Sequence, residues 1–178
     1  MGRRDVRFVV DSMLGKLAKW LRMLGYDTLY SRNYEDWQLL RIAEKTKRII
    51  VTRDRGLYWR ARRRGLRVVL VESDDIATRL AELYVKAGIR LEADPEKSRC
   101  PLCNSELIIV REKTLVKDRV PPESLRTFDK FYVCPRCGKV YWEGSHWRNI
   151  KMLVEDAKER VELVRTYLER SKGRSRPS

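Results

Sequence analysis

The sequence predicts an α/β fold, in which helices flank a parallel sheet, followed by a small zinc ribbon and a C-terminal helix. Three observations support this prediction. Short β-branched runs alternate with helical patterns over residues 6–92. Two Cys-x-x-Cys pairs follow, and an apolar stripe at helical spacing begins at about residue 148. We therefore expect a main domain over 1–92, a ribbon over 93–147, and an amphipathic helix with a basic tail over 148–178.

The main domain alternates four expected strands with four expected helices. The strands are expected at 6–10, 28–30, 48–52 and 67–71. The first helix carries Leu14, Leu17, Leu21 and Leu24 on one face, and Gly25 ends it. Three further helices are expected: one begins at Asp36, one ends at about residue 64, and one spans 76–87. Alternation at this spacing is typical of a parallel sheet with helices on both faces.

The four cysteines of the chain form two pairs, Cys100–Cys103 and Cys134–Cys137. Four thiolates fill the coordination shell of Zn²⁺, so such a site is structural. The alternative is two disulfides. The N-terminal sequence lacks the apolar segment of a secretion signal, which favours reduced thiols and a cytoplasmic location. We therefore expect one zinc ion bound by all four cysteines.

Three aspartates occupy similar places in the pattern. Asp11 follows the first strand, Asp54 follows the third, and Asp36 begins a helix. Groups at the carboxyl ends of parallel strands gather in one crevice, and clustered carboxylates favour Mg²⁺ or Mn²⁺. Each aspartate alone is equally well explained as a helix cap. Asp75, beside Asp74, is a further candidate ligand.

The net charge of +15 favours a polyanionic partner, and we expect nucleic acid. An anionic membrane surface or simple solubility is the alternative, although no apolar run is long enough to span a bilayer. Aromatic residues lie among the basic ones: Tyr58 and Trp59 near Asp54, and Trp142, His146 and Trp147 after the last cysteine. Trp59 also fits a core position, and His146 a structural role beside the ribbon. The candidate RNA-binding residues are Arg53, Arg55, Arg60, Arg62, Arg63, Arg64, Lys139 and Arg148.

Several segments resemble the Mut7-C family, which joins a PIN-like nuclease fold to a C-terminal zinc ribbon. They are VVDSMLGKLAKWLRMLGYDT, IIVTRDRGL, SRCPLCNSEL and FYVCPRCGKVYWEGSHW. The resemblance covers roughly residues 7–148. It implies a PIN-like sheet and a metal-dependent endoribonuclease, with Asp11, Asp36 and Asp54 at the positions of the PIN acidic residues.

The resemblance also implies RNA as the partner, with tRNA, rRNA or the ribosome as candidate targets. Many PIN nucleases carry one more acidic residue between the positions of Asp11 and Asp36. Here Glu35 and Asp27 are the nearby candidates. The rival hypothesis is a non-catalytic RNA- or ribosome-binding protein that keeps the fold.

Overall fold

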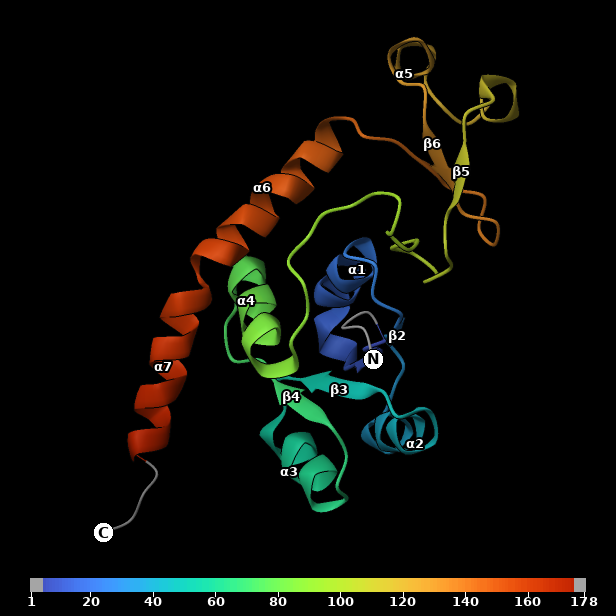
Figure 1. Ribbon diagram of the computed structural model, residues 1–178. Coiled ribbons are helices and arrows are strands. Elements are labelled where there is room, and N and C mark those ends of the chain that lie inside the picture. The colour runs from blue at the N-terminus through green and yellow to red at the C-terminus, as the bar shows by residue number, and fades with distance from the viewer. Residues whose placement is uncertain (1–4, 175–178) are drawn as a thin grey trace.

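The computed structural model describes residues 5–174, and its centre is a parallel sheet (Figure 1). Its four strands stand in the order β2-β1-β3-β4. Phe8 pairs with both Thr28 and Ile49, so the first strand is central. The strands are β1 (Phe8–Val10), β2 (Thr28–Tyr30), β3 (Ile49–Thr52) and β4 (Val68–Leu70). The expected parallel α/β sheet is confirmed.

Helices cover both faces of this sheet (Figure 1). The helices are α1 (Gly15–Met23), α2 (Asp36–Thr46), α3 (Arg55–Arg63) and α4 (Ile76–Ala87). A 3-10 turn, η1 (Ser12–Leu14), leads into α1. Apolar residues of α1 and α4 pack into one core, and those of α2 and α3 pack into the other. Because the strands are parallel, all four end at the same edge of the sheet, and the helix that follows each strand begins there.

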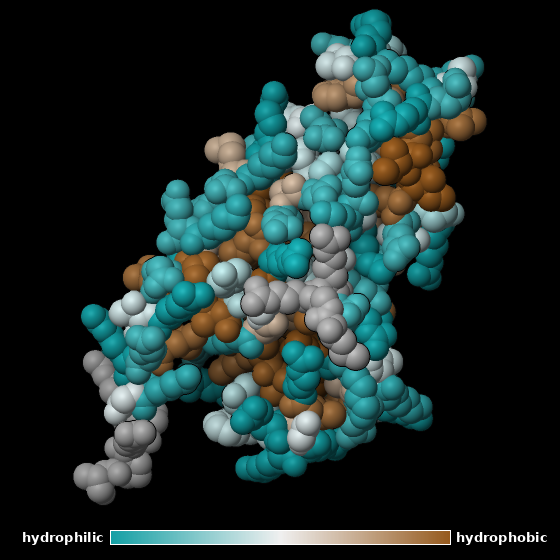
Figure 2. Space-filling model, in the orientation of Figure 1, coloured by the Kyte–Doolittle hydropathy of each residue, from teal (hydrophilic) through white to brown (hydrophobic). Residues whose placement is uncertain are grey.

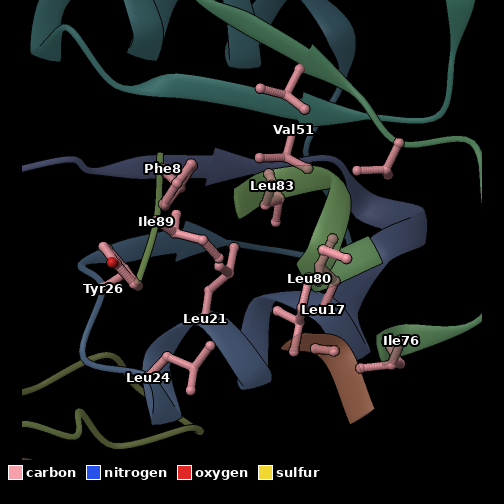
Figure 3. Packing of buried hydrophobic residues seen from close by; sticks show 14 of the residues in the cluster. Phe8, Leu17, Leu21, Leu24, Tyr26, Val51, Ile76, Leu80, Leu83 and Ile89 are labelled. Atoms are coloured by element: carbon pink, nitrogen blue, oxygen red, sulfur yellow. The ribbon is translucent and has the colours of Figure 1, made fainter. Parts of the chain in front are cut away.

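The alternating side chains of the strands build the two cores. Val9 and Ile50 face α2 and α3, whereas Phe8 and Val51 face α1 and α4. The larger core is shown in Figure 3, where Leu17 and Leu21 of α1 meet Leu80 and Leu83 of α4. All these side chains are almost completely buried. Burial on both faces explains why the strands are continuous apolar runs rather than alternating ones.

The ribbon is an antiparallel sheet with a small core of its own. Its strands are β5 (Ile108–Val110), β6 (Phe131–Val133) and β7 (Val140–Tyr141), with β6 in the middle. A 3-10 turn, η2 (Lys113–Leu115), and a short helix, α5 (Pro122–Thr127), connect β5 to β6. Val116, Val120 and Phe131 form the core under these connections. Figure 2 shows an apolar patch over β5, where Ile108 and Ile109 are exposed.

The C-terminal segment forms two helices where the sequence predicted one over 148–169. These are α6 (Ser145–Glu159) and α7 (Val161–Arg174), and they meet at Arg160. The apolar stripe continues through the junction, because Ala157 and Val161 both pack in the core beside α4. Arg160 itself pairs with Asp75 and Asp156.

The basic tail was expected over the last eight residues, 171–178, but residues 171–174 are helical, and 175–178 lie outside the described residues. Over the described part of the chain, no helix is both long and apolar enough to cross a membrane.

Candidate functional site

The four cysteine sulfurs lie together in the ribbon. All four Sγ atoms lie within 4.8 Å of one another. The Sγ atoms of Cys100 and Cys137 are 3.6 Å apart, and those of Cys103 and Cys134 are 3.3 Å apart. Tetrahedral zinc with Zn–S bonds of about 2.3 Å places its sulfurs about 3.8 Å apart. The thiols are free, so the cluster has the donors and the spacing of a structural zinc site.

Two matching turns present these sulfurs. The N–H of Asn104 donates to the carbonyl of Cys100, and the N–H of Gly138 donates to that of Cys134. Asn104 and Gly138 both adopt left-handed backbone, with φ of 69° and 74°, a conformation that glycine and asparagine tolerate best. Each Cys-x-x-Cys pair is therefore closed by a residue suited to the turn.

Hydrogen bonds stabilise the thiolate form of Cys134. Its burial alone would raise the pKa, but donors including the backbone N–H of Cys137 and the Cys103 thiol outweigh burial and lower the pKa to about 6. The Tyr141 hydroxyl lies 3.3 Å from Cys100 Sγ. Burial and the hydrogen bond with the Cys100 sulfur raise the pKa of Tyr141, so the phenol stays protonated and can donate to the sulfur.

Asp11 lies buried at the carboxyl end of β1, only 4% exposed. The Thr52 hydroxyl donates to Asp11 Oδ2 at 2.7 Å, and the same oxygen of Thr52 accepts the Asp54 N–H at 2.9 Å. Thr52 thus joins the ends of two neighbouring strands, β1 and β3. Within residues 5–174, Asp11 has no ion-pair partner. Hydrogen bonds from the hydroxyls of Thr52 and Ser12 compensate the burial of this carboxylate.

Asp54 lies beside this pair but serves as the N-cap of α3. Its Oδ1 accepts the Leu57 N–H at 2.8 Å. Gly56 leaves room for this arrangement, because an added Cβ at Gly56 would lie 3.0 Å from Asp54 Oδ1. The Asp54 side chain is exposed. The capping role considered from the sequence is therefore present, and a carboxylate can cap through one oxygen and offer the other to a ligand.

Asp36 is the first residue of α2 and forms an ion pair with Arg60 of α3. It stands at the same edge of the sheet as Asp11 and Asp54. Across the described residues, the cysteine cluster is the only group of three or more His, Cys, Asp or Glu with ligand atoms that close together. In this conformation the three aspartates share an edge but do not form such a cluster.

The remaining acidic candidates have other partners. Asp75 caps α4 by accepting from Thr78, and it pairs with Arg160. Burial alone would raise the pKa of Asp75, but these donors and charges outweigh it and lower the pKa. Asp74 pairs with Arg53. Glu35 forms a capping box with Gln38 at the start of α2.

Asp27 lies at the opposite edge of the sheet, just before β2. Both of its oxygens accept from Arg48, at 2.9 and 3.0 Å, and Asn104 donates to it at 2.7 Å. It therefore joins the sheet to the ribbon. Asp27 was a candidate for the extra acidic residue, and the structure removes it, because parallel strands bring together only groups at the same ends.

The basic candidates fall into two groups. Arg53, Arg55, Arg60 and Arg64 form ion pairs with carboxylates of the protein. Among the described residues, the others make no ion pair: Arg62, Arg63, Lys139 and Arg148. These four unpaired side chains are available to bind phosphate.

The aromatic candidates differ in how far they are exposed to solvent. Trp59 is 56% exposed and packs edge-on against Tyr58, so the expected core position for Trp59 is wrong. Trp147 is buried at the start of α6, and Trp142 packs on Phe131 inside the ribbon. His146 is exposed. Sequence reasoning missed Thr52, although it stands in the quoted run TRDRGL.

The comparisons with known proteins add one match. A family model described as Mut7-C RNAse domain matches residues 6–154. Neither the comparison with curated proteins nor the comparison with solved structures gave a match.

Proposed function

This chain belongs to the Mut7-C RNase family, and from that premise we propose that it is a metal-dependent endoribonuclease whose active site includes Asp11 and Asp54. RNA is the substrate class that the family implies. The observation that supports the site is the buried Asp11, which Thr52 links to Asp54 at the carboxyl edge of the sheet. In open α/β sheets this edge is where ligands bind, especially where the strand order reverses.

The proposed metal is Mg²⁺ or Mn²⁺, because the available donors are carboxylate oxygens. When bound, such a cation activates water and neutralises charge on the phosphodiester. Asp11 and Asp54 would hold it. Asp36 would join them after exchanging Arg60 for the cation, and Arg60 would then be free to bind phosphate. Asp75 is left out of this pocket, because its carboxylate caps α4 and pairs with Arg160.

A second function has an observation in its favour. Asp36 is neutralised by Arg60, and Asp54 caps α3. If both side chains keep these roles, the pocket holds too few carboxylates for catalysis, and the protein binds RNA without cleaving it. The tRNA, rRNA and ribosome targets belong equally to both proposals.

The experiment compares RNA cleavage by the wild type and by Asp11→Asn with Mn²⁺, Mg²⁺ or no added metal. Labelled single-stranded and hairpin RNAs serve as substrates, and Mn²⁺ binding is followed by electron paramagnetic resonance. We expect Asp11→Asn to lose both cleavage and Mn²⁺ binding while it remains folded. Asp118→Asn, an exposed aspartate in the ribbon, is the matched control. Wild-type protein that binds these RNAs but neither binds Mn²⁺ nor cleaves them would establish the binding function instead.

A further inference from the structure

A groove of about 500 Å³ runs between α1 and the ribbon, apart from the aspartates described above. Residues of α1 line one wall, and the second wall comes from the zinc turns, β7 and the start of α6. Six of the lining residues have basic or aromatic side chains: Lys16, Lys19, Trp20, Lys139, Tyr141 and His146. The groove therefore exists only where the ribbon meets the sheet domain.

The groove is positively charged. Lys16, Lys19 and Lys139 are exposed, and none of them makes an ion pair with any residue from 5 to 174. No carboxylate is among the described residues that line the groove. Many other basic side chains of this protein are neutralised by acidic neighbours, as Arg60 is by Asp36. Three unpaired lysines on facing walls provide charge complementarity for an anionic chain.

Aromatic residues line the same groove as the lysines. Trp20 belongs to the α1 wall, and Tyr141 and His146 belong to the opposite wall. A second, mostly apolar pocket of about 230 Å³ shares Met23, Tyr141 and His146 with the groove. It offers an apolar, aromatic-lined space for one flat base beside a charged track.

The groove also leads toward the proposed active site. Helix α1 starts at the edge of the sheet where Asp11 lies, and Lys16 is in its first turn. At about 1.5 Å per residue, the helix carries this wall roughly 10 Å from Lys16 to Met23. At the ribbon end, the hydrogen bond of Tyr141 to Cys100 fixes the ring against the cysteine cluster.

We propose that this groove binds single-stranded RNA, with phosphates on the three lysines and one unstacked base in the adjoining pocket. This inference rests on the proposed RNA-directed function and specifies its substrate class. A duplex keeps its bases stacked inside, whereas a single strand can turn one out onto aromatic side chains. Lysine contacts supply the affinity for phosphate, and the pocket supplies the preference for an unpaired base.

The first test measures binding of a fluorescent single-stranded RNA by anisotropy over a range of salt concentrations. All proteins carry Asp11→Asn and are assayed without added Mg²⁺ or Mn²⁺, so cleavage does not interfere. We expect Lys16→Gln/Lys19→Gln/Lys139→Gln to bind more weakly and to reduce the slope of log K against log salt by about 2, at about 0.7 per phosphate. Lys45→Gln/Lys117→Gln/Lys172→Gln makes the same change in net charge away from the groove. Equal losses in the two triple variants would overturn the inference.

The second test concerns the base. His146→Ala should weaken binding of an intact single strand by roughly fivefold or more, and should have little effect on an RNA whose bases are removed. Trp37→Ala, on α2 and 55% exposed, is the control. The wild type should also prefer the single strand to a duplex of the same sequence. Equal affinity for the two forms, or an unchanged His146→Ala variant, would contradict the base pocket.

These outcomes are independent of the proposed catalysis. Protein with an intact Asp11 that cleaves RNA, together with a triple lysine variant that binds RNA normally, would refute the groove and leave the nuclease function standing. Groove-dependent binding with no cleavage under any metal would refute the nuclease and leave the groove.

Discussion

Two glycines of the quoted motifs make room for particular side chains near the proposed active site. In DSMLG, an added Cβ at Gly15 would lie 2.5 Å from the Tyr30 hydroxyl, which donates to the Ser12 carbonyl. In TRDRGL, Gly56 leaves space for the Asp54 carboxylate over the start of α3. At both positions a neighbouring side chain occupies the space that a Cβ would need: Tyr30 at Gly15, and the Asp54 carboxylate at Gly56.

We predict that Gly15→Ala destabilises the protein by about 1–3 kcal/mol, the usual range for overpacking. Tyr30 must move away from the start of α1, and its hydrogen bond to Ser12 is then lost. Thermal unfolding measures the loss. Gly173→Ala is the matched control, because nothing lies within 4 Å of an added Cβ there, and alanine in a helix is neutral or stabilising. Equal stability of the two variants would contradict the steric argument.

Asp27 provides a prediction on pH. Burial alone would raise the pKa of this carboxyl, but hydrogen bonds from Arg48 and Asn104 outweigh it and lower the pKa. A folded-state pKa below the unfolded value of about 3.9 means that Asp27 stabilises the fold above that pH. This stabilisation disappears as the pH falls through the folded pKa.

We therefore expect Asp27→Asn to lose roughly 3 kcal/mol of stability at pH 7, because it leaves the buried Arg48 without its partner. The stability of the variant should also fall less between pH 5 and acid pH than that of the wild type. Denaturant unfolding at several pH values measures both effects. Asp129→Asn, whose carboxylate is largely exposed beside Lys113, should change much less. Parallel acid curves for wild type and Asp27→Asn would disprove the linkage.

At the scale of elements, the strands and helices of the sheet domain could be predicted because local patterns determine them. A short β-branched run between polar residues, such as Ile49–Thr52, favours a strand over any other element. Gly25 and Gly65 mark helix ends, because both adopt the positive φ that glycine tolerates. The break at Arg160 could not be predicted, since the apolar stripe continues through it.

The same distinction applies to the candidate site. Strand ends placed Asp11 and Asp54 at one edge, as the pattern indicated. The direction of each carboxylate depends on donors that spacing does not reveal, such as the Leu57 N–H for Asp54 and Arg60 for Asp36. For that reason Asp36 stands at the expected edge with an unexpected partner.

Helix α7 gives a prediction at this scale. Val161 and Val164 lie in the main core and pack beside α4. Removing residues 161–178 should cost roughly 3 kcal/mol, at about 1.5 kcal/mol for each buried valine, and should expose the apolar face of α4. Unfolding curves and binding of an apolar dye measure these effects. Removal of residues 173–178 alone should have little effect. Equal stability of the two truncations would show that α7 does not support the core.

At the scale of the molecule, the ribbon and the sheet domain are joined close to the cysteine cluster. Arg22, buried in α1, donates to the carbonyls of Pro101 and Leu102 in the first zinc turn. Asn104 donates to Asp27 and accepts from the Thr28 N–H. These contacts fix the turn against the sheet domain and hold the second wall of the proposed RNA groove in place.

Zinc removal should therefore weaken RNA binding while the sheet domain stays folded. The wild type should contain about one zinc per chain, by the four-ligand site. Chelation, or Cys137→Ser, should loosen the zinc turns, since such sites couple metal binding to local folding. Proteolysis should then cut first within residues 93–147, and single-stranded RNA binding should weaken as the groove loses a wall. The sheet domain should keep its helices, because no buried residue of its two cores comes from the ribbon; of the described ribbon residues, only Ala93 at the domain boundary packs against these cores.

Restoring zinc to the chelated wild type should restore RNA binding, whereas zinc should not rescue Cys137→Ser. Zinc content, circular dichroism and anisotropy measured on one sample separate metal loss from unfolding. RNA affinity that survives complete zinc loss would show that the groove does not need the ribbon wall, and binding would then depend on the arginines of α3, of which Arg62 and Arg63 make no ion pair in the described part of the chain. Loss of the sheet itself on chelation would instead mean that Arg22 and Asn104 transmit the stability of the zinc site to the whole protein.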